Sequence, residues 1–426
     1  MGRESNRRPG ARGERPRVHA LEILRWAHGG EGVGIPADGP LAGRIVFAND
    51  VVPGDVVDLD IVEHKERWAR GQVVSWARRS PERAPVPCAV QGRCGGCPWM
   101  AGSAAAQAAS RRAILEGELK KRLGLTADEV SARLVMLESP SRLGYRQRLR
   151  LTYEVRDGRV ALGFLGKKSH ALVDVLRCEV ADERLNAALP EVRARALALG
   201  GSGRVTLLAG DEGVAGVFEG QGGDTARFGP DVVTTRLGRF TQRLAPEAFA
   251  QASGAVTGQM LETLLAWAKD ARLDTDPWAV ELFAGAGTLT MALWEAGWKV
   301  AAYEVAEAAR AGFEATRAAA GVPPERGRWH AADLSIGVPL PAPPAPALVV
   351  LDPPRTGAAE VIDWVRGSGA RRVVYVSCDL ATGLRDLAAL VRDGRFRITA
   401  IVGLDMFPHT GHQEVMVLAQ AAESEP

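Results

Sequence analysis

The stretch Val373-Val374-Tyr375-Val376-Ser377-Cys378-Asp379-Leu380-Ala381-Thr382 is a run of β-forming residues that ends in a single cysteine. The residues that follow, 383–390, have the composition of a helix. A strand that ends at Cys378 and turns into a helix places the sulfur at the carboxyl edge of a sheet, where open α/β sheets bind ligands. We expect the amides of the helix start to favour the thiolate, the nucleophilic form. The alternative is a small buried cysteine, the usual role of a lone Cys.

The surrounding chain predicts an α/β fold. From about residue 247 a helical run at 256–269 is followed by alternating strands and helices, a pattern typical of a parallel sheet. The strands expected in this part are 279–283, 299–303, 348–351, 372–377, 397–402 and 415–419. The proline-rich stretch 338–346 is expected to be a loop.

Length and composition indicate an ordinary soluble protein. A chain of 426 residues is too long for one core and predicts two or three domains. No apolar run is long enough to span a bilayer, and the N-terminus lacks the apolar segment of a signal peptide. We therefore expect a cytoplasmic protein that has no contact with membranes and is a monomer.

The first 17 residues form a basic arm. They hold six Arg and two Glu, whereas the whole chain has a net charge of only +2. An arm of this composition is expected to be disordered. It either adds salt-sensitive affinity for nucleic acid or is a solvated tail without a role.

Residues 18–78 are expected to form a small β-domain, because short strand-like pieces are separated by turns that contain Gly and Pro. The segments 31–35 and 52–55 resemble those of a TRAM domain, an OB-like barrel found on RNA-modifying enzymes. Barrels of this type bind nucleic acid through strand faces and loops. The alternative is a barrel that only supports its neighbour.

Four of the five cysteines form a set that is separate from Cys378. Cys88, Cys94 and Cys97 lie close together in the chain, and Cys178 is remote. An odd count in a cytosolic chain argues against a disulfide framework. Four thiolates suit tetrahedral zinc or an iron–sulfur cluster, and the three-plus-one arrangement favours a [4Fe–4S] cluster. Zinc and four unligated core thiols are the alternatives.

The segment between these cysteines predicts an α+β domain. Residues 104–122 have the pattern of an amphipathic helix. Arg146, Arg148 and Arg150 alternate with other residues, which predicts a strand with one guanidinium face. Such a row can hold phosphates or stack on bases, or it is a solvated strand face.

A second strand end carries cofactor-binding features. The strand 279–283 runs into Ala284-Gly285-Ala286-Gly287-Thr288, and the next strand ends at Glu304, where an acid can hold a ribose diol. Because the third glycine of a dinucleotide fingerprint is replaced by Thr290, a nucleoside without phosphates fits better. This points to S-adenosylmethionine, with Asp333 placed to bond the adenine. The alternative for Glu304 is a surface acid after a strand.

The turn Asp352-Pro353-Pro354-Arg355-Thr356-Gly357 closes the strand 348–351. Two prolines make the turn stiff and remove backbone donors. Because this turn and Cys378 both follow carboxyl strand ends, we expect Asp352 and Cys378 to face the same site. A stiff turn without a further role does not explain why a carboxylate opens it.

Three motifs in order resemble the RNA 5-methyluridine methyltransferase family: Asp352–Gly357, the Ser377-Cys378 segment with Thr382, and Phe407-Pro408 with Glu414. The cysteine set and the N-terminal β-domain are similar to those of the branch that acts on 23S rRNA. The resemblance covers nearly the whole chain after the basic arm. It implies a Rossmann-like methyltransferase domain with an N-terminal TRAM barrel and a central iron–sulfur domain.

The resemblance also implies roles for residues. Cys378 is the nucleophile and Glu414 the base. The S-adenosylmethionine site consists of Gln251, Phe283, Gly285, Thr288, Glu304, Asp333 and Asp352. The [4Fe–4S] cluster is bound by Cys88, Cys94, Cys97 and Cys178.

The sequence departs from the family pattern in places that concern uracil and cofactor contacts. Asp379-Leu380 stands where the family usually has Asn-Pro, and Ser253 and Thr288 replace common asparagines. The expected domains are an arm at 1–17, a TRAM domain at 18–78, a central domain at 79–245 and a methyltransferase domain at 246–426.

The expected reaction is methylation of carbon 5 of a uridine in RNA. A thiolate that adds to carbon 6 makes carbon 5 nucleophilic, and a carboxylate then removes the carbon 5 proton. The substrate is expected to be 23S rRNA, with tRNA as the alternative. A 5-methylcytosine enzyme is disfavoured because its second cysteine is missing from the turn 352–355. The rival from another class is a non-catalytic iron–sulfur RNA-binding protein.

Overall fold

The computed structural model describes residues 16–167, 169, 171–270, 277–338 and 346–422, so the predicted arm lies almost wholly outside the described residues. The chain divides into two compact units. Unit 1 comprises Met1–Val86 and Pro98–Ser110, and unit 2 comprises Pro87–Cys97 and Arg111–Pro426. Among the described helices, none combines the length and apolar character needed to cross a membrane.

The described strands of unit 1 form a six-stranded sheet in the order β1-β5-β6-β4-β3-β2. The strands are β1 (Arg17–Glu22), β2 (Arg25–Trp26), β3 (Gly32–Gly34), β4 (Ile45–Ala48), β5 (Val56–His64) and β6 (Trp68–Arg78). Buried residues alternate along β5, with Val57, Leu59 and Ile61 in the core, as a half-buried strand requires. Trp26 also stacks on Trp99, with 4.7 Å between the ring centroids.

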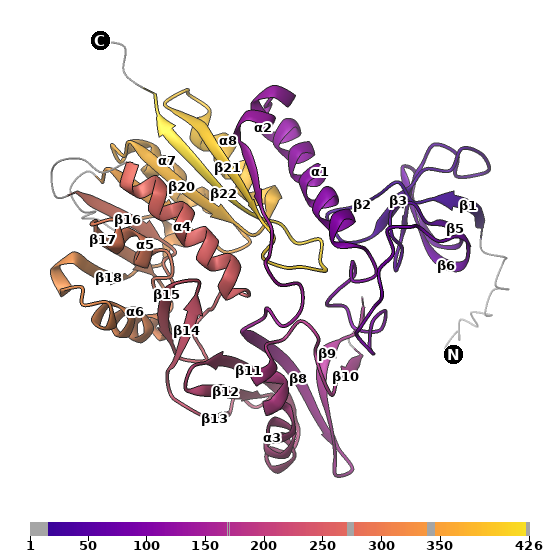
Figure 1. The fold of residues 1–426 in the computed structure, drawn as a ribbon, viewed down its shortest axis with the longest axis horizontal. Helices are drawn as coiled ribbons and strands as arrows, with labels where there is room; N and C mark the ends of the chain where they lie inside the picture. The colour runs from indigo at the N-terminus through magenta and orange to yellow at the C-terminus, as the bar shows by residue number, and fades with distance from the viewer. Residues whose placement is uncertain (1–15, 168, 170, 271–276, 339–345, 423–426) are drawn as a thin grey trace, which may run out of the picture. The chain divides into compact units, whose positions relative to one another are not determined.

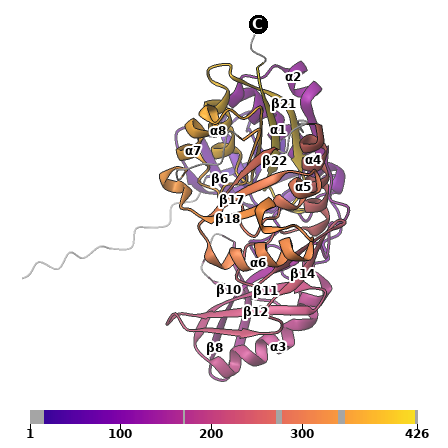
Figure 2. The same ribbon diagram turned by 90° about the vertical axis from the view of Figure 1, so that its left-hand side faces the viewer.

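The first sheet of unit 2 contains six described strands in the order β10-β9-β8-β11-β12-β13. They are β8 (Arg148–Arg156), β9 (Arg159–Leu165), β10 (Leu172–Asp174), β11 (Ser202–Gly210), β12 (Gly213–Gly220) and β13 (Thr225–Phe228). Helix α3 (Glu183–Leu199) covers one face of this sheet, as Figure 2 shows. Leu149, Leu151 and Tyr153 alternate along β8 and pack in that core.

The second sheet of unit 2 contains eight described strands in the order β18-β17-β16-β19-β20-β22-β21-β7 (Figure 1). They are β7 (Leu134–Leu137), β16 (Trp278–Leu282), β17 (Lys299–Glu304), β18 (Gly327–Ala331), β19 (Leu348–Leu351), β20 (Arg372–Ser377), β21 (Phe396–Leu404) and β22 (Glu414–Ala421). The run from β18 to β20 is parallel, and β22 is antiparallel to both β20 and β21. A short hairpin of β14 (Val233–Leu237) and β15 (Phe240–Leu244) lies between β13 and α4 in the chain.

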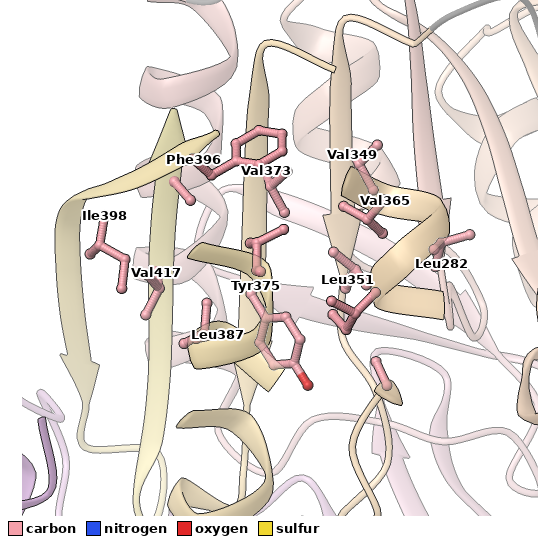
Figure 3. Packing of buried hydrophobic residues seen from close by; sticks show 14 of the residues in the cluster. Leu282, Val349, Leu351, Val365, Val373, Tyr375, Leu387, Phe396, Ile398 and Val417 are labelled. Atoms are coloured by element: carbon pink, nitrogen blue, oxygen red, sulfur yellow. The ribbon is translucent and has the colours of Figure 1, made fainter. Parts of the chain in front are cut away.

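Helices cover both faces of the eight-stranded sheet and give two cores. One core contains side chains of α1 (Ala104–Leu123), α2 (Ala127–Arg133), α7 (Ala359–Gly367) and α8 (Leu380–Val391). The other contains side chains of α4 (Gly254–Asp270), α5 (Thr290–Glu295) and α6 (Glu307–Ala319). Each fully buried aliphatic side chain contributes about 1.5–3 kcal/mol. Figure 3 shows the first core, where the ring of Tyr375 packs beside Leu387 and its hydroxyl points away from the apolar side chains.

The structure confirms the Rossmann-like α/β prediction, including the strand 372–377 and the helix that follows it. The prediction of a parallel sheet is wrong at one side, because β21 and β22 form an antiparallel hairpin. Two strands were missed, β18 and β7. β7 comes from a segment far earlier in the chain and pairs with β21, and local sequence patterns carry no signal for such a long-range pairing.

Candidate active site

The loop after β16 forms one wall of the candidate site. Phe283, Gly285 and Gly287 have φ values of 60°, 53° and 78°. Positive φ costs little for glycine, but it is unusual for phenylalanine and marks a backbone held in a strained conformation. The loop therefore has a fixed shape that a glycine-rich sequence alone does not ensure.

The carboxylate of Glu304 closes against this loop from the end of β17. One oxygen accepts a hydrogen bond from the amide of Gly285 at 2.9 Å. The other accepts from the amides of Val305 and Ala306, each at 2.8 Å. A carboxylate has about four acceptor positions, so one remains for a ligand hydroxyl. The structure thus places Glu304 beside the G-x-G turn, and its predicted contact with a ribose diol stays a prediction.

Gln242 on β15 supports the other end of the loop and was missed in the sequence. Its side-chain amide donates to the carbonyl of Ala286 at 3.2 Å and to the hydroxyl of Thr288 at 3.0 Å. Gln242 is 1% exposed. It occupies a core position between Phe240 and Leu244 on an alternating strand, and a polar residue at such a position was the available signal.

Glu281 on β16 is a second residue that sequence reasoning did not single out. It is 1% exposed, and its carboxylate accepts a hydrogen bond from the hydroxyl of Thr290. Burial raises the pKa of Glu281 to about 8, and the charges of Asp352 and Glu304 add to the rise while the Thr290 hydrogen bond opposes it. An acid within the apolar run Ala279–Leu282 was the signal for this site.

Asp333 lies two residues after the end of β18, whose last residue, Ala331, pairs with Glu304. The amide of Ala332 donates to the carbonyl of Glu304 at 2.9 Å. Asp333 is exposed, and its carboxylate accepts hydrogen bonds from the amide and the hydroxyl of Ser335, at 3.0 and 2.6 Å. The structure therefore brings Asp333 to the same sheet edge as Glu304. Both hydrogen bonds from Ser335 go to the Oδ1 atom of Asp333.

Asp352 follows β19 and lies at the centre of the site. The side-chain amide of Gln251 donates to its carboxylate at 3.2 Å. Burial raises the pKa of Asp352 to about 7. The pKa of Glu414, which is 3% exposed, is raised well above its ordinary value by burial and then by the charge of Asp352, and Arg355 opposes the rise. The two carboxyl groups thus act on one another.

Cys378 faces the same group of side chains, as the sequence predicted for Asp352 and Cys378. Burial raises the pKa of the Cys378 thiol to about 11, the charges of Glu414 and Asp352 raise it further, and the Arg355 guanidinium opposes the rise. Cys378 is half-buried. A thiol, two carboxyl groups and one guanidinium therefore act on one another within one site.

The prediction that the helix start favours a Cys378 thiolate is wrong. Asp379 caps α8, and one carboxylate oxygen accepts from the amides of Ala381 and Thr382, each at 3.0 Å. The capping carboxylate takes up the donors and places negative charge where the helix dipole would have favoured the sulfur. Burial, with the charges of Glu414 and Asp352, instead raises the pKa of the Cys378 thiol above its ordinary value.

Helix α8 anchors the turn that carries Asp352 and Arg355. The Asp386 carboxylate accepts from the amide of Ala358 and from the Tyr375 hydroxyl, each at 2.6 Å. Arg385 pairs with Asp386 at 2.7 Å, and the hydroxyl of Thr382 donates to the carbonyl of Arg355 at 2.9 Å. These contacts hold the turn against the helix that follows Cys378, and the bonds from Asp386 to Ala358 and Tyr375 are buried.

Glu414 is the first residue of β22, and the loop before it is held from two distant segments. Arg111 on α1 pairs with the buried Asp405 at 3.1 Å and donates to the carbonyls of Phe407 and Thr410, each at 3.2 Å. The Tyr145 hydroxyl is 3.2 Å from the carbonyl of Pro408, to which it donates. We name the segment Phe407–Glu414 the base loop. Its anchors fix the direction from which Glu414 enters the site.

The cysteines of the other set lie near one another in unit 2. Burial raises the pKa of Cys97 to about 12, and the negative charges that Cys178, Cys94 and Cys88 can carry add to the rise. The amide of Gly96 donates to the sulfur of Cys94 at 3.4 Å. In the described parts of the chain, no group of three or more His, Cys, Asp or Glu side chains is arranged to hold a metal ion. The structure thus gathers the thiols without placing them as a formed metal site.

The arginine row of the sequence is less regular than expected. β8 begins only at Arg148, and Arg146 precedes it. Arg146 and Arg148 are half-buried, each with a buried Nε, whereas Arg150 is exposed and pairs with Glu219 at 2.9 Å. The expected single guanidinium face is therefore wrong for Arg146, which turns toward the interior.

No family model matches the chain. It is 32% identical to a 23S rRNA (uracil(1939)-C(5))-methyltransferase of Klebsiella pneumoniae over 88% of this chain and 91% of that protein. It is 30% identical to an uncharacterized RNA methyltransferase of Thermosynechococcus vestitus over 93% of this chain and 97% of that protein. These identities extend over nearly the full length of each protein.

Among solved structures, the fold resembles that of the Pyrococcus abyssi tRNA (uracil-54, C5)-methyltransferase in complex with S-adenosyl-L-homocysteine. The TM-score is 0.69 at 21% identity, over 95% of this chain and 100% of that chain. At this identity the likeness concerns the fold. Together with the identity to the Klebsiella protein, it leads to one conclusion: the chain belongs to the RNA uracil-C5 methyltransferase family.

Proposed function

We propose that this protein methylates carbon 5 of a uridine in 23S rRNA with S-adenosylmethionine as the methyl donor. The observation that carries the proposal is that Cys378, Glu414 and Asp352 act on one another electrostatically within one site. A thiol and a buried carboxyl group are the two groups that carbon 5 methylation of a pyrimidine requires. The relatives that share about a third of the sequence are named for the same reaction.

In this proposal Cys378 forms a bond from sulfur to carbon 6 of the uracil, which makes carbon 5 nucleophilic. Carbon 5 then takes the methyl group of the donor's sulfonium. Glu414 removes the proton that remains on carbon 5, and the bond between Cys378 and carbon 6 breaks to release the product. The target base has to leave its stack to reach a half-buried sulfur.

The raised pKa values have a role in this scheme. Burial raises the pKa values of Glu281, Asp352, Glu414 and Cys378 above their ordinary values. A cationic sulfonium beside Asp352 would favour the carboxylate forms, because opposite charges lower the pKa of an acid. Arg355 lowers the pKa of both Cys378 and Glu414, so it favours their anionic forms from the same side.

We propose that the methyl donor is held by the loop after β16 and by three strand ends. The proposed contacts are Gln251, Phe283, Gly285, Thr288, Glu304, Asp333 and Asp352. The free acceptor position of Glu304 suits a ribose hydroxyl, and the second oxygen of Asp333 suits an amine of the adenine ring. The strained φ of Phe283 supports this assignment, because such strain is concentrated at ligand sites.

We propose that Cys88, Cys94, Cys97 and Cys178 bind a [4Fe–4S] cluster. Four thiols that act on one another electrostatically are a suitable donor set, and metal binding would displace their protons. The cluster performs no step of the reaction and serves to join two distant segments of the chain. Iron and sulfide analysis of anaerobically purified protein tests this, and stoichiometric zinc without sulfide would establish the alternative.

We also propose the domain organisation that the sequence suggested. The six-stranded sheet of unit 1 is the expected TRAM domain at 18–78, with a central domain at 79–245 and a methyltransferase domain at 246–426. Aromatic and basic side chains on this sheet support an RNA-binding role, since Arg79 lies over the ring of Trp76 at 4.8 Å. The protein is proposed to act as a cytoplasmic monomer.

The test of the reaction uses 23S rRNA tritiated at uridine carbon 5. The wild-type protein is expected to release tritium only when S-adenosylmethionine is present. The same RNA with 5-fluorouridine is expected to form a covalent adduct that survives denaturation. Tritium release from tRNA but not from rRNA would identify tRNA as the substrate. RNA binding without tritium release or adduct would favour the non-catalytic RNA-binding protein.

A further inference from the structure

The connection between β21 and β22 is held by a buried ion pair. It runs over residues 405–413, because β21 ends at Leu404 and β22 begins at Glu414. Its first residue, Asp405, pairs with Arg111 of α1 at 3.1 Å, and the two side chains are 2% and 1% exposed. A buried ion pair needs further hydrogen bonds to offset the hydration that both groups lose. The base loop supplies such bonds to Arg111.

One nitrogen of Arg111 holds the turn at the start of the base loop. Its Nη2 donates to the carbonyls of Phe407 and Thr410, each at 3.2 Å, and also contacts Asp405. The amide and the hydroxyl of Thr410 donate to the carbonyl of Phe407 as well, at 3.2 and 2.8 Å. His409 within this turn is 7% exposed and has a φ of 69°. A positive φ is costly for a residue with a Cβ, so the surrounding contacts have to hold the turn in this shape.

The position of Arg111 is fixed by the packing of α1. Leu115 and Leu119 follow Arg111 at intervals of four residues, so the three side chains lie on one face of the helix. Both leucines are fully buried in a core of the eight-stranded sheet. The guanidinium group therefore reaches the base loop from an element that is itself packed against the sheet.

The end of the base loop places Glu414 near the strand that leads to Cys378. Leu404 pairs with Glu414 across the β21–β22 hairpin, and Val415 pairs with Ser377, the residue before Cys378. On its other side β20 pairs with β19, so β20 is held in the sheet independently of the base loop. A shift of the base loop would therefore displace Glu414 relative to the sulfur.

We propose that Arg111, together with Asp405, is a positioning residue for Glu414, and that it acts on the removal of the carbon 5 proton and not on the earlier steps. In that step the proton goes from carbon 5 to the Glu414 carboxylate. The electron pair of the broken bond forms the double bond between carbons 5 and 6 as the sulfur of Cys378 leaves. Proton transfer needs an acceptor within hydrogen-bonding reach, so a small displacement of Glu414 slows it. The inference rests on the proposed function.

The test compares variants of the ion pair with the wild type, all as the full chain. Arg111→Met removes the charge and the donors, whereas Arg111→Lys keeps the charge. A double variant, Arg111→Met with Asp405→Asn, removes both charges, so no buried carboxylate loses its counter-charge. Arg112→Met is the matched control, because Arg112 is the next residue of α1, but its side chain is 44% exposed and bonds to Glu116 at 2.8 Å.

Three measurements separate the steps of the reaction. Methylation of 23S rRNA gives kcat and both KM values. RNA with 5-fluorouridine gives the rate of adduct formation, because fluorine on carbon 5 cannot leave as a proton and the reaction stops after methyl transfer. RNA deuterated at uridine carbon 5 gives the isotope effect on kcat, which grows as proton removal becomes slower than the other steps.

Arg111→Met is expected to lower kcat about 10²-fold with both KM values within about twofold of the wild type. Its rate of adduct formation on 5-fluorouridine RNA should also stay within about twofold, and its isotope effect should be larger. The double variant is expected to regain Tm but not kcat, because the carbonyls of Phe407 and Thr410 still lack their donor. Arg111→Lys should recover part of kcat, and Arg112→Met should match the wild type.

Three results would overturn the inference while the wild type is active. The first is a wild-type kcat in Arg111→Met. The second is adduct formation that slows as much as turnover, which would mean that the ion pair supports the whole site. The third is a double variant that regains kcat together with Tm, which would assign the loss in Arg111→Met to stability alone.

Two further outcomes are kept apart from these. Should Arg111→Met fail to fold, the double variant and Arg111→Lys provide the same comparison of turnover with adduct formation. Absence of both tritium release and adduct in the wild type would refute the proposed reaction itself.

Discussion

The side-chain amide of Gln251 donates a 3.2 Å hydrogen bond to the carboxylate of Asp352, although 101 positions separate the two residues in the chain. Gln251 is 8% exposed and precedes α4, whereas Asp352 follows β19. The bond joins the segment before α4 to the turn that follows β19. It also shows how the site is assembled from segments that no local pattern connects.

Changing Gln251 therefore tests the proposed donor site. Gln251→Ala is expected to lower kcat/KM for S-adenosylmethionine about tenfold, because a buried carboxylate loses its donor. Gln251→Glu is expected to cost about a hundredfold, because a second carboxyl group would lie within hydrogen-bonding distance of Asp352. Steady-state kinetics with tritiated RNA measures both. Equal losses in the two variants would contradict the electrostatic explanation.

Variants of Glu414 and Cys378 are expected to differ in whether a covalent RNA adduct accumulates. Glu414→Gln keeps the shape of the side chain but cannot accept the carbon 5 proton, so kcat should fall by about 10²–10⁴ and a methylated covalent RNA adduct should accumulate. Cys378→Ala should form no adduct and release no tritium. Denaturing gels with labelled RNA distinguish the two. A Cys378→Ala protein that still forms adduct would remove that residue from its role.

The buried Glu281 is expected to make stability depend on pH. The ordinary pKa of glutamate is 4.5 and that of folded Glu281 is about 8, so between these values the native state binds more protons than the unfolded state. Stability therefore falls as pH rises through this window and levels off above it. Asp352, whose pKa is about 7 in the folded protein, acts in the same direction.

Glu281→Gln removes one of these two contributions. The fall in Tm between pH 6 and pH 9 is expected to become smaller by several degrees, as calorimetry can measure (about 2–4 °C for each kcal/mol). Glu262→Gln serves as the control, because Glu262 is exposed and pairs with Arg239. A Tm slope that is the same in Glu281→Gln and wild type would show that Glu281 is not a buried neutral acid.

Two glycines of the loop after β16 should respond differently to alanine. A Cβ on Gly285 would meet no atom within 4 Å, whereas a Cβ on Gly287 would lie 2.6 Å from the ring of Phe313. Both have positive φ, which costs alanine about 1 kcal/mol. Gly287→Ala should therefore lower Tm clearly more than Gly285→Ala.

The open space beside Gly285 is where the proposed donor would lie. Gly285→Ala is expected to fold and to bind RNA, but to raise the Kd for S-adenosylmethionine about tenfold because the methyl group enters that space. Isothermal titration calorimetry checks this. Unchanged donor affinity in Gly285→Ala would place the methyl donor elsewhere.

The hydrogen bond from Tyr375 to Asp386 is expected to matter for the turn 352–357. Tyr375→Phe removes one donor and should cost about 1 kcal/mol of stability with little effect on kcat, since the amide of Ala358 still bonds to Asp386. Asp386→Ala leaves several buried donors unpaired and should lower both stability and kcat. An Asp386→Ala protein with wild-type kcat would mean that the turn needs no support from α8.

Several elements could be predicted from the sequence because their signals are local. The strand 372–377 is a run of β-formers, and Cys378 follows it directly. Glu304 and Asp352 each follow a short apolar run, so their place at the sheet edge was predictable. Gln242 and Glu281 were not assigned to the site, because a polar residue in a strand has no functional signal until its neighbours in space are known.

The amino-acid sequence by itself determined the α/β pattern, the strand ends that carry Cys378, Asp352 and Glu304, and the family. These features depend on residues that are adjacent in the chain or repeat at a helical or strand period. Only the tertiary structure decided the antiparallel β21–β22 hairpin, the raised pKa of Cys378 and the anchoring of the base loop by Arg111 and Tyr145. Burial and charge act through space, so the ionisation of a side chain depends on partners that folding brings from distant parts of the chain.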